Sequence, residues 1–406
     1  MASSPRAAPD NAPDIHGKRS LYDVVVVGAG VQGSATAYQC AKEGLKTVLL
    51  EQFSLPHTRG SSHGQSRIIR YAYDQPHYAE MMLEAFPMWA QLEKETNTVL
   101  YKKTGLLTVS MHPTGALFHK SLKQMRKYNR GHKVLDHKTL KRDYPQLSLP
   151  QTALAFLDYD GGTLRADKAL RALQTAFVDH GGMLYDCQKV VQIIPGTTVR
   201  VVTEDREFCG KSLVLTPGAW ASPLLKPLGL DPPLEVWRIN VPYWREKECG
   251  GMKTFPNVII ESEETGSHIY SIQSLEYPGM TKVAYHGGSD CVDPDCRDDV
   301  PPGKKEEVEY LKRSVSKYYS ALESEPSIIE TCMYTNTPDD ELIIDRHPVY
   351  PNIAVCCGCS GHGFKLAPSV GKILCHLAMG KEPHINIAAL SFKRFKNSCM
   401  THSSKL

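Results

Sequence analysis

One short segment near the start of the chain limits the possible folds more than any other. Residues 22–27 are an almost unbroken apolar run, which is typical of a buried strand. The pattern Gly-x-Gly-x-x-Gly follows at 28–33, then a helical stretch over 34–43 and a second apolar strand over 47–50. Strand, glycine turn, helix and strand within about thirty residues predict a βαβ unit that binds a dinucleotide.

The residue types in this unit suit that ligand. Gly28 and Gly30 allow a tight turn and a close approach of the backbone to a pyrophosphate, and Gly33 lets the helix pack on the strand. The N-terminus of the helix offers N–H groups to negative charge. Glu51, which ends the second strand, can accept hydrogen bonds from ribose hydroxyls and opposes a 2′-phosphate. The motif leaves open whether the dinucleotide is a nicotinamide or a flavin.

Cations follow the second strand. His63, Arg67 and Arg70 fall within eight residues, with an apolar pair at 68–69 between the arginines. This pattern indicates cations near buried surface, where a guanidinium requires an anion. A structural cluster of ion pairs explains the same pattern equally well.

A second segment of small residues lies near the C-terminal end. Residues 360–365 read Ser-Gly-His-Gly-Phe-Lys and precede a helical stretch over 366–377. Gly361 and Gly363 permit a planar or anionic group to approach the backbone closely, and Lys365 places a cation beside it.

The chain has 12 cysteines and no signal-peptide pattern, which favours a reducing compartment. By residue type alone, Cys332 is a small buried hydrophobic residue. Cys356, Cys357 and Cys359 lack the second Cys-x-x-Cys or spaced histidine pair that would complete a metal site, so we expect no metal.

Several of these segments together resemble the monomeric sarcosine oxidase family of flavoproteins, and its peroxisomal members above the others. The segments are 60–64 (Gly-Ser-Ser-His-Gly), 67–70 (Arg-Ile-Ile-Arg), 332–335 (Cys-Met-Tyr-Thr) and 360–365. They occur in the family's order and spacing, and the resemblance extends over residues 22–395. It implies a mixed α/β fold like that of glycine oxidase and D-amino acid oxidase. In that fold a Rossmann-like FAD-binding domain is interleaved with a sheet-rich substrate domain.

The resemblance also implies a role for individual residues. Cys332 matches the cysteine that is bonded covalently to the 8α carbon of FAD, which replaces the interpretation from residue type. Arg67 and Lys282 match cations on opposite faces of the flavin, and the lysine is implicated in oxygen activation. Arg70 and Lys365 match the pair that holds the substrate carboxylate. The remaining matches are His63 near the flavin, the substrate-cavity residues Tyr270, His286 and Tyr334, and the cofactor-binding residues Gly361, Gly363 and Phe364.

By this resemblance the chain is an FAD-dependent oxidase of secondary amino acids such as L-pipecolate, sarcosine and L-proline. It transfers a hydride equivalent to covalent FAD and, with O₂, gives an imine and hydrogen peroxide. The alternatives are an NAD(P)-dependent dehydrogenase and a flavin-binding protein without turnover. The sequence does not decide which amine is preferred, because a few methylenes change pocket fit by only about 1–3 kcal/mol.

The order of the elements predicts two domains whose segments alternate. We expect helices over 76–96, 165–180 and about 305–322, short strands over 183–216 and 235–290, and buried strands at 343–345 and 353–355. The FAD-binding domain then comprises 21–80, 160–230 and 325–395, and the substrate domain comprises 81–159 and 231–324. Residues 1–20 form a flexible arm and 396–406 a tail.

The tail ends in Ser404-Lys405-Leu406, the tripeptide that a peroxisomal import receptor recognises, so we expect a peroxisomal protein. The net charge of +3 is spread along the chain, which argues against a nucleic-acid partner. No run of apolar residues reaches the length that spans a bilayer, so we expect no membrane association. The family resemblance implies a monomer.

Overall fold

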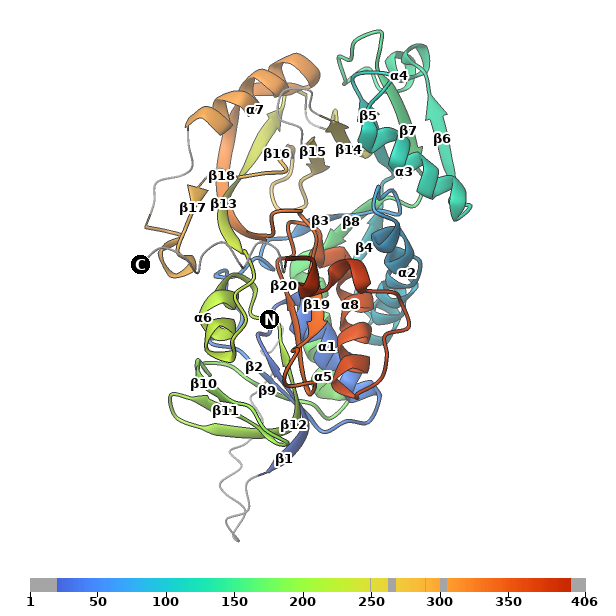
Figure 1. Ribbon diagram of the computed structural model, residues 1–406. Coiled ribbons are helices and arrows are strands. Elements are labelled where there is room, and N and C mark those ends of the chain that lie inside the picture. Colours follow the sequence, from blue (N-terminus) through green and yellow to red (C-terminus); the bar gives the residue numbers. More distant parts are fainter. Residues whose placement is uncertain (1–19, 249, 262–267, 289, 300–304, 396–406) are drawn as a thin grey trace, which may run out of the picture.

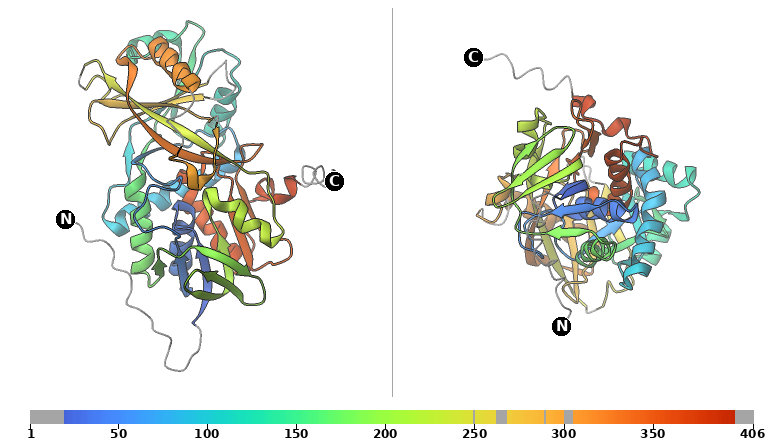
Figure 2. Two further views of the ribbon diagram at one scale, coloured as in Figure 1. Left: turned by 90° about the vertical axis from the view of Figure 1, so that its left-hand side faces the viewer. Right: turned by 90° about the horizontal axis from the view of Figure 1, so that it is seen from below.

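The computed structural model describes residues 20–248, 250–261, 268–288, 290–299 and 305–395. The expected N-terminal arm, apart from Ser20, and the tail with its C-terminal tripeptide lie outside these residues. Two large sheets occupy opposite ends of an elongated molecule (Figure 1). The left view of Figure 2 shows the same division from the side.

The first sheet has eight strands and begins with the predicted βαβ unit. Five of its strands are parallel, in the order β20-β12-β1-β2-β9, because apolar runs buried on both faces suit a parallel sheet. The ribbon β10–β11 and strand β19 extend it by antiparallel pairing. The strands are β1 (Leu21–Val27), β2 (Thr47–Leu50), β9 (Met183–Tyr185), β10 (Val190–Ile194), β11 (Val199–Thr203), β12 (Glu207–Leu215), β19 (Ile343–Arg346) and β20 (Ile353–Cys357).

Alternation along the strands divides the core between the two faces of this sheet. Val24 and Val26 of β1 pack under the helices α1 (Val31–Lys42), α2 (Pro76–Thr96), α5 (Ala166–Asp179) and α8 (Gly363–Ala378). Val25 and Val27 point to the other face, which is covered by β10, β11 and the short helix α6 (Ala221–Leu225). Both faces are therefore closed, and ligands can approach only at the ends of the strands.

The second sheet has nine strands in the order β17-β13-β16-β15-β14-β5-β7-β6, with β18 paired to β13. Helix α7 (Lys305–Tyr318) packs on it through Leu311 and Val315, and α3 (Ala116–Lys127) and α4 (His137–Asp143) flank its other end. The strands are β5 (Leu106–Ser110), β6 (His132–Leu135), β7 (Leu154–Asp158), β13 (Glu235–Glu246), β14 (Asn257–Glu261), β15 (His268–Gln273), β16 (Met280–Tyr285), β17 (Asp290–Cys291) and β18 (Leu322–Asn336).

A small sheet lies between the two large ones in Figure 1 and carries part of the site. It consists of β3 (Ser66–Ile69), β8 (Gly162–Arg165) and β4 (Tyr101–Lys103) in the order β3-β8-β4. Strand β3 contains Arg67 and leads directly into Arg70.

Most of the expected elements are present, with shifts at their ends. The helix expected over 76–96 is α2, with those bounds. The helices expected over 34–43 and 366–377 each begin three residues earlier, because both start inside the glycine turn that precedes them. Residues 322–336, for which no strand was predicted, form the long strand β18 of the second sheet. The expected domain boundary at 325 falls within this strand, and the domain division stays a prediction.

Among the described residues, no helix is both long enough and apolar enough to cross a bilayer.

Candidate active site

A cavity of about 1490 Å³ opens between the two large sheets and takes lining residues from both. It exceeds the roughly 300–1,000 Å³ of pockets for drug-sized ligands, as a site for a dinucleotide together with a substrate requires. The cavity brings together every predicted site residue except Gly33, although they come from distant parts of the chain.

The glycine turn forms one end of the cavity. Gly28 has φ +98°, a backbone conformation that favours glycine, and a Cβ there would lie 2.5 Å from the carbonyl oxygen of Thr216. Gly33 faces away from the cavity, and its Cβ would lie 1.9 Å from the carbonyl oxygen of Gly28. The first glycine therefore shapes the turn, and Gly33 lets α1 pack against it.

Side chains from two other segments bind this turn. The amide of Ala29 donates to Glu51 Oε2 at 2.9 Å, and the amide of Val31 donates to Ser62 Oγ at 3.0 Å. Glu51 is buried at the cavity wall. Its Oε1 accepts from the amide of Phe53 at 3.2 Å and lies 3.4 Å from His57 Nε2, whereas Oε2 keeps a lone pair for a further donor such as a ribose hydroxyl.

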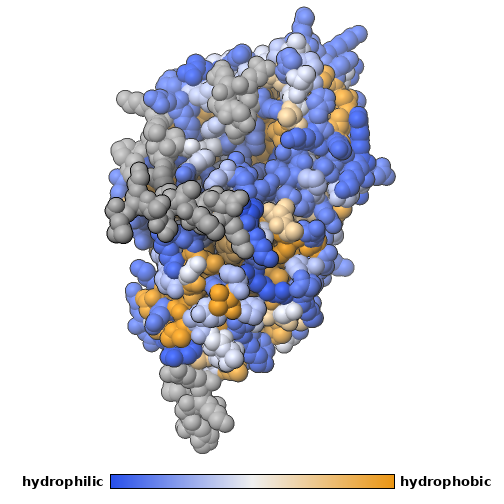
Figure 3. Space-filling model, in the orientation of Figure 1, coloured by the Kyte–Doolittle hydropathy of each residue, from blue (hydrophilic) through white to orange (hydrophobic). Residues whose placement is uncertain are grey.

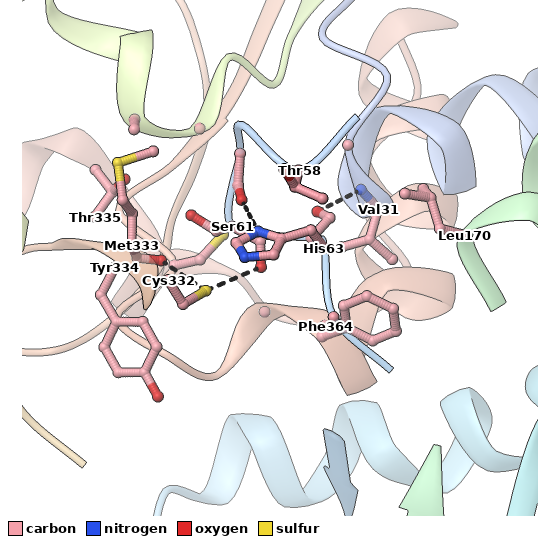
Figure 4. Close-up of a pocket in the computed structure, with 18 of the residues that line it drawn as sticks. Val31, Thr58, Ser61, His63, Leu170, Cys332, Met333, Tyr334, Thr335 and Phe364 are labelled. Carbon is pink, nitrogen blue, oxygen red and sulfur yellow. Dashed lines mark hydrogen bonds between the residues drawn. The ribbon is translucent and has the colours of Figure 1, made fainter. Parts of the chain in front are cut away.

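Cys332 and His63 meet at the loop over 60–64 (Figure 4). Cys332 lies on β18, and its buried Sγ points at the carbonyl oxygen of Ser61, 3.8 Å away. His63 Nε2 lies 3.0 Å from the carbonyl oxygen of Thr331, one residue before Cys332. Burial lowers the pKa of His63 from its ordinary value, and Arg67 lowers it further. The thiol is thus presented to the cavity from a strand of the second sheet.

Arg67 is held by backbone oxygens. Its Nη2 donates to the carbonyls of Ser61 and His63 at 3.0 and 2.7 Å, and its Nη1 donates to the carbonyl of Ser66 at 2.8 Å. Its guanidinium also lies 5.6 Å from the centre of the Phe364 ring. These contacts fix a full positive charge at the cavity wall, beside the loop that Cys332 faces.

Arg70 and Lys365 share one partner, Tyr73. Lys365 Nζ donates to the hydroxyl oxygen of Tyr73 at 3.1 Å, and the guanidinium of Arg70 lies 4.6 Å from the centre of its ring. Both cations are at least nine-tenths buried, and Nη1 of Arg70 has no hydrogen-bond partner among the described residues. Burial, together with Arg70 and Arg67, holds the pKa of Lys365 well below its usual range. No carboxylate among the described residues pairs with either cation, so the two together can hold an anion.

Histidines and tyrosines surround this anion site. His286 stacks on His268, with ring centres 4.4 Å apart, and lies 5.2 Å from His362 and 5.5 Å from Tyr334. Burial, with Lys365 and Arg70, lowers the pKa of His286 to about 3. Burial also lowers the pKa of His268 and His362 and raises the pKa of Tyr270 to about 12. These groups are uncharged at neutral pH. They can therefore form hydrogen bonds with a ligand, while the charge that attracts an anion comes from Arg70 and Lys365.

Lys282 lies on β16, on another wall of the cavity. Its Nζ donates to Ser66 Oγ at 2.7 Å and lies 3.9 Å from Glu276 Oε1. Ser66 Oγ in turn donates to Glu276 Oε1 at 3.0 Å. Burial lowers the pKa of Lys282 to about 8, although the Glu276 carboxylate opposes this shift.

The cavity fits a flavin dinucleotide and a small anionic substrate. The turn over 28–33 has the geometry that lets a pyrophosphate approach the backbone. At Gly361 a Cβ would lie 2.5 Å from the His286 ring and 2.7 Å from the Tyr334 ring, so only glycine leaves this space open. The unpartnered Nη1 of Arg70 supplies a donor for a carboxylate.

Sequence reasoning missed four residues of this site: Tyr73, His268, Glu276 and Ser62. His268 could have been found, because it lies two residues before Tyr270 on one strand and therefore shares its face. Glu276 and Ser62 carry no local signal, since their partners Ser66 and Val31 are 210 and 31 residues away in the sequence.

Comparisons with known proteins are consistent with this geometry. A family model described as DAO, FAD dependent oxidoreductase, matches residues 23–377. The peroxisomal sarcosine oxidase of Homo sapiens is 45% identical over 391 residues, which cover 95% of this chain and 99% of that protein. The monomeric sarcosine oxidase of Bacillus sp. is 31% identical over 383 residues, covering 93% of this chain and 97% of that protein.

The fold is similar to that of a solved amino acid oxidase. The open form of NikD, described as essential for nikkomycin biosynthesis, superposes with a TM-score of 0.78 at 23% identity. The match covers 91% of this chain and 97% of that structure. Together with the family match, it confirms the expected fold class, a mixed α/β fold of the FAD-dependent oxidoreductase type.

Proposed function

The chain belongs to the DAO family of FAD-dependent oxidoreductases and, within it, to the sarcosine oxidases; from this premise we propose that it oxidises small secondary amino acids. Its substrates are L-pipecolate, sarcosine and, more weakly, L-proline. The products are an imine and, with O₂ as the second substrate, hydrogen peroxide.

Two parts of the cavity hold the cofactor in this proposal. The turn over 28–33 and Glu51 bind the adenosine diphosphate end, and the segments of Arg67, Cys332 and 361–365 surround the flavin. When bound, FAD supplies a two-electron acceptor that takes a hydride equivalent from the substrate and returns the electrons to O₂. Arg67 and Lys282 provide fixed positive charge where negative charge develops during this exchange.

The observation that carries the substrate class is the pair of buried cations Arg70 and Lys365. The pair faces a cavity, shares only a neutral tyrosine and leaves Nη1 of Arg70 without a partner among the described residues. A bound carboxylate offsets the burial of both charges and fixes the orientation of the substrate's C–H bond. The neutral His286 and the tyrosines Tyr270 and Tyr334 then line the space for the rest of the amino acid.

Flavin reduction tests this function directly. Purified holoenzyme is mixed with L-pipecolate, sarcosine or L-proline without air, and the loss of yellow colour is followed. We expect bleaching by at least one of them, recovery of the colour on admission of air, and one peroxide formed per imine. A dehydrogenase would instead require added nicotinamide, and a protein without turnover would keep its colour throughout.

We further propose that Cys332 bonds covalently to the 8α carbon of FAD. Its support is the position of the buried thiol, which lines the cavity and contacts the carbonyl of Ser61. Mass spectrometry of the peptide that contains Cys332 should show the added mass of the flavin, and acid-denatured protein should stay yellow. In Cys332→Ser the colour should separate from the protein on denaturation, whereas in Cys375→Ser, a buried thiol away from the cavity, it should remain attached.

The proposal also covers the protein's localisation and oligomeric state. We propose that the protein is a peroxisomal monomer, because its relatives include a peroxisomal and a monomeric sarcosine oxidase, and that Ser404-Lys405-Leu406 contacts the import receptor. The domain division given above is part of this proposal. Fluorescence microscopy of a tagged chain with and without that tripeptide tests the peroxisomal localisation. Sedimentation of the holoenzyme tests the monomeric state.

A further inference from the structure

We propose that Glu276 is a positioning residue for Lys282: acting through Ser66, it holds the ammonium group at the cavity wall and keeps it charged while O₂ is reduced. This inference rests on the proposed function, in which Lys282 faces the reacting oxygen. Glu276 itself acts only through Lys282.

The three side chains form a closed triangle. Lys282 Nζ donates to Ser66 Oγ at 2.7 Å, Ser66 Oγ donates to Glu276 Oε1 at 3.0 Å, and Nζ and Oε1 are 3.9 Å apart. The lysine and glutamate side chains are each 4% exposed. A charge pair with so little contact with water is screened far less than a pair on the surface.

The carboxylate is itself fixed from its other side. Glu276 Oε2 accepts hydrogen bonds from the amide of Leu275 at 2.8 Å and from Ser274 Oγ at 3.1 Å. These bonds lie within the turn between β15 and β16, so they hold the carboxylate in place independently of Lys282. Ser66 lies on β3 beside Arg67, and the triangle therefore links the small sheet to the second large sheet at the cavity wall.

The other charged and titratable groups around Lys282 do not replace this contact. Arg67 on β3 disfavours the charged form of the lysine, and Glu330 and Cys332 on β18 favour it less than Glu276 does. Glu330 accepts hydrogen bonds from the hydroxyls of Tyr243 and Tyr277 at 3.0 and 2.7 Å. The Tyr243 ring on β13 lies 5.5 Å from Nζ.

The position matters because burial works against the ammonium form. Burial already lowers the pKa of Lys282 to about 8, and of the groups that oppose this shift Glu276 has the largest effect. Without the carboxylate a larger share of Lys282 is neutral near pH 7–8, and a neutral amine does not stabilise negative charge on oxygen. The lost effect should return at lower pH, where the lysine is protonated again.

The first experiment measures Lys282 without any substrate. Holoenzyme labelled with ¹³C at lysine Cε is titrated by NMR, and Lys282→Met identifies the signal. We expect the pKa of Lys282 to fall by about one unit or more in Glu276→Gln, a tenfold change in the ratio of the two forms. Glu84→Gln is the matched control, because Glu84 also accepts from a serine and a lysine, Ser369 and Lys372, but lies outside the cavity. An unchanged pKa in Glu276→Gln overturns the proposal.

The second experiment separates oxidation from reduction. Stopped-flow rates of reaction of the reduced holoenzyme with O₂ should fall about fivefold or more at pH 8 in Glu276→Gln and recover towards pH 6, following the protonation of Lys282. Flavin reduction by the amino acid should change by less than about twofold, since that step does not use Lys282. Equal loss in both steps, or loss without recovery at low pH, contradicts the proposal.

Two milder variants keep the test decisive if Glu276→Gln does not fold. Glu276→Asp should retain most of the oxygen reaction, and Ser66→Ala should slow that reaction while flavin reduction by the amino acid changes by less than about twofold. A holoenzyme that no secondary amino acid reduces would overturn the proposed function instead. The two failures are distinguishable, because the NMR titration needs no turnover.

Discussion

Four of the cations that line the cavity, Arg67, Arg70, Lys282 and Lys365, differ in what balances their charge. Arg67 is surrounded by three backbone oxygens, and Lys282 has the carboxylate of Glu276. Among the described residues, no carboxylate pairs with Arg70 or Lys365, and both contact Tyr73, a phenol whose pKa burial raises to about 12. Protein groups thus balance the charges of Arg67 and Lys282, whereas Arg70 and Lys365 remain open to an anionic ligand.

Arg70→Ala should weaken substrate binding far more than it slows the chemical step. Truncating one partner of a buried charge pair costs about 2–5 kcal/mol, so we expect the KM for L-pipecolate to rise at least thirtyfold. Arg130→Ala is the control, because that arginine also lies over a tyrosine ring, at 4.8 Å from the centre of Tyr71, but outside the cavity. Unchanged saturation in Arg70→Ala would place the carboxylate elsewhere.

Lys282→Met should affect the other half of the reaction. Removing the ammonium group takes away the charge that stabilises reduced oxygen, an effect of about 3 kcal/mol or roughly a hundredfold in rate. Reduction by the amino acid should remain within a few-fold of the original rate. Both rates are measured separately by stopped flow, and an equal loss in both would remove the role assigned to this lysine.

At the scale of elements, the site depends on how closely α1 approaches the end of β1. The close contact between Gly33 and the carbonyl of Gly28 leaves no room for a side chain. The amides of Ala29 and Val31 are already bonded to Glu51 and Ser62, which ties the turn to two other segments. A change in the turn therefore alters the cofactor end of the cavity as a whole.

Gly33→Ala should destabilise the protein and impair FAD binding together. The added Cβ would lie 1.9 Å from a backbone oxygen that no side-chain rotation can move, so the helix must shift. We expect a loss of about 1–3 kcal/mol in the free energy of unfolding and substoichiometric flavin in the purified protein. Gly60→Ala, where a Cβ would meet nothing within 4 Å, should retain its flavin. Absorbance at the flavin band and urea unfolding measure both effects.

At the scale of the molecule, the two large sheets each provide walls of one cavity. The apolar cores lie within the separate halves, whereas buried cations such as Arg70 and Lys282 lie in the cavity where the halves meet. The face shown in Figure 3 is mostly hydrophilic, with apolar side chains in small separate patches. In contrast to this face, the cavity holds cations such as Arg70 and Lys282 and three histidines, His268, His286 and His362, with little contact with water.

These histidines should make the folded protein sensitive to acid. The pKa of His286 is lowered to about 3 in the folded state, so its contribution to stability is present above its ordinary pKa of 6.5 and is lost as the pH falls towards 3. The pKa values of His268 and His362 are lowered too, because burial disfavours their charged forms and His286, Arg70 and Lys365 lie near them.

The free energy of unfolding should therefore fall between pH 7.5 and pH 5. For His286 alone the expected loss is about 1–2 kcal/mol, since the unfolded chain binds a proton that the folded chain excludes. Urea unfolding of substrate-free holoenzyme at the two pH values measures it. The loss should be smaller in His286→Gln and unaltered in His112→Gln, whose histidine is exposed. Equal stability at both pH values would contradict the buried, neutral state.

Local pattern was sufficient for several features of this protein. We could predict the βαβ unit, the bounds of α2, and the cations Arg67, Arg70 and Lys365 that follow the two glycine-containing segments. Sterics and hydrogen bonding within a turn or helix depend on neighbours in the sequence, so local pattern is enough for these features. The family resemblance added which of these residues face one site. Strand β18 was not predicted, because buried and exposed side chains do not alternate regularly along its first half. The strand is stabilised by its pairing with β13.

Which groups meet was decided by the tertiary structure. Cys332 contacts Ser61 across 271 residues, Lys282 contacts Ser66 across 216, and Tyr73 lies between Arg70 and Lys365 only because α8 packs beside the segment after β3. The sequence by itself determined the dinucleotide turn and supplied the cations. Only the fold paired them with a carboxylate, a tyrosine or an open cavity, because these contacts depend on strand pairing and helix packing between segments that no local pattern relates.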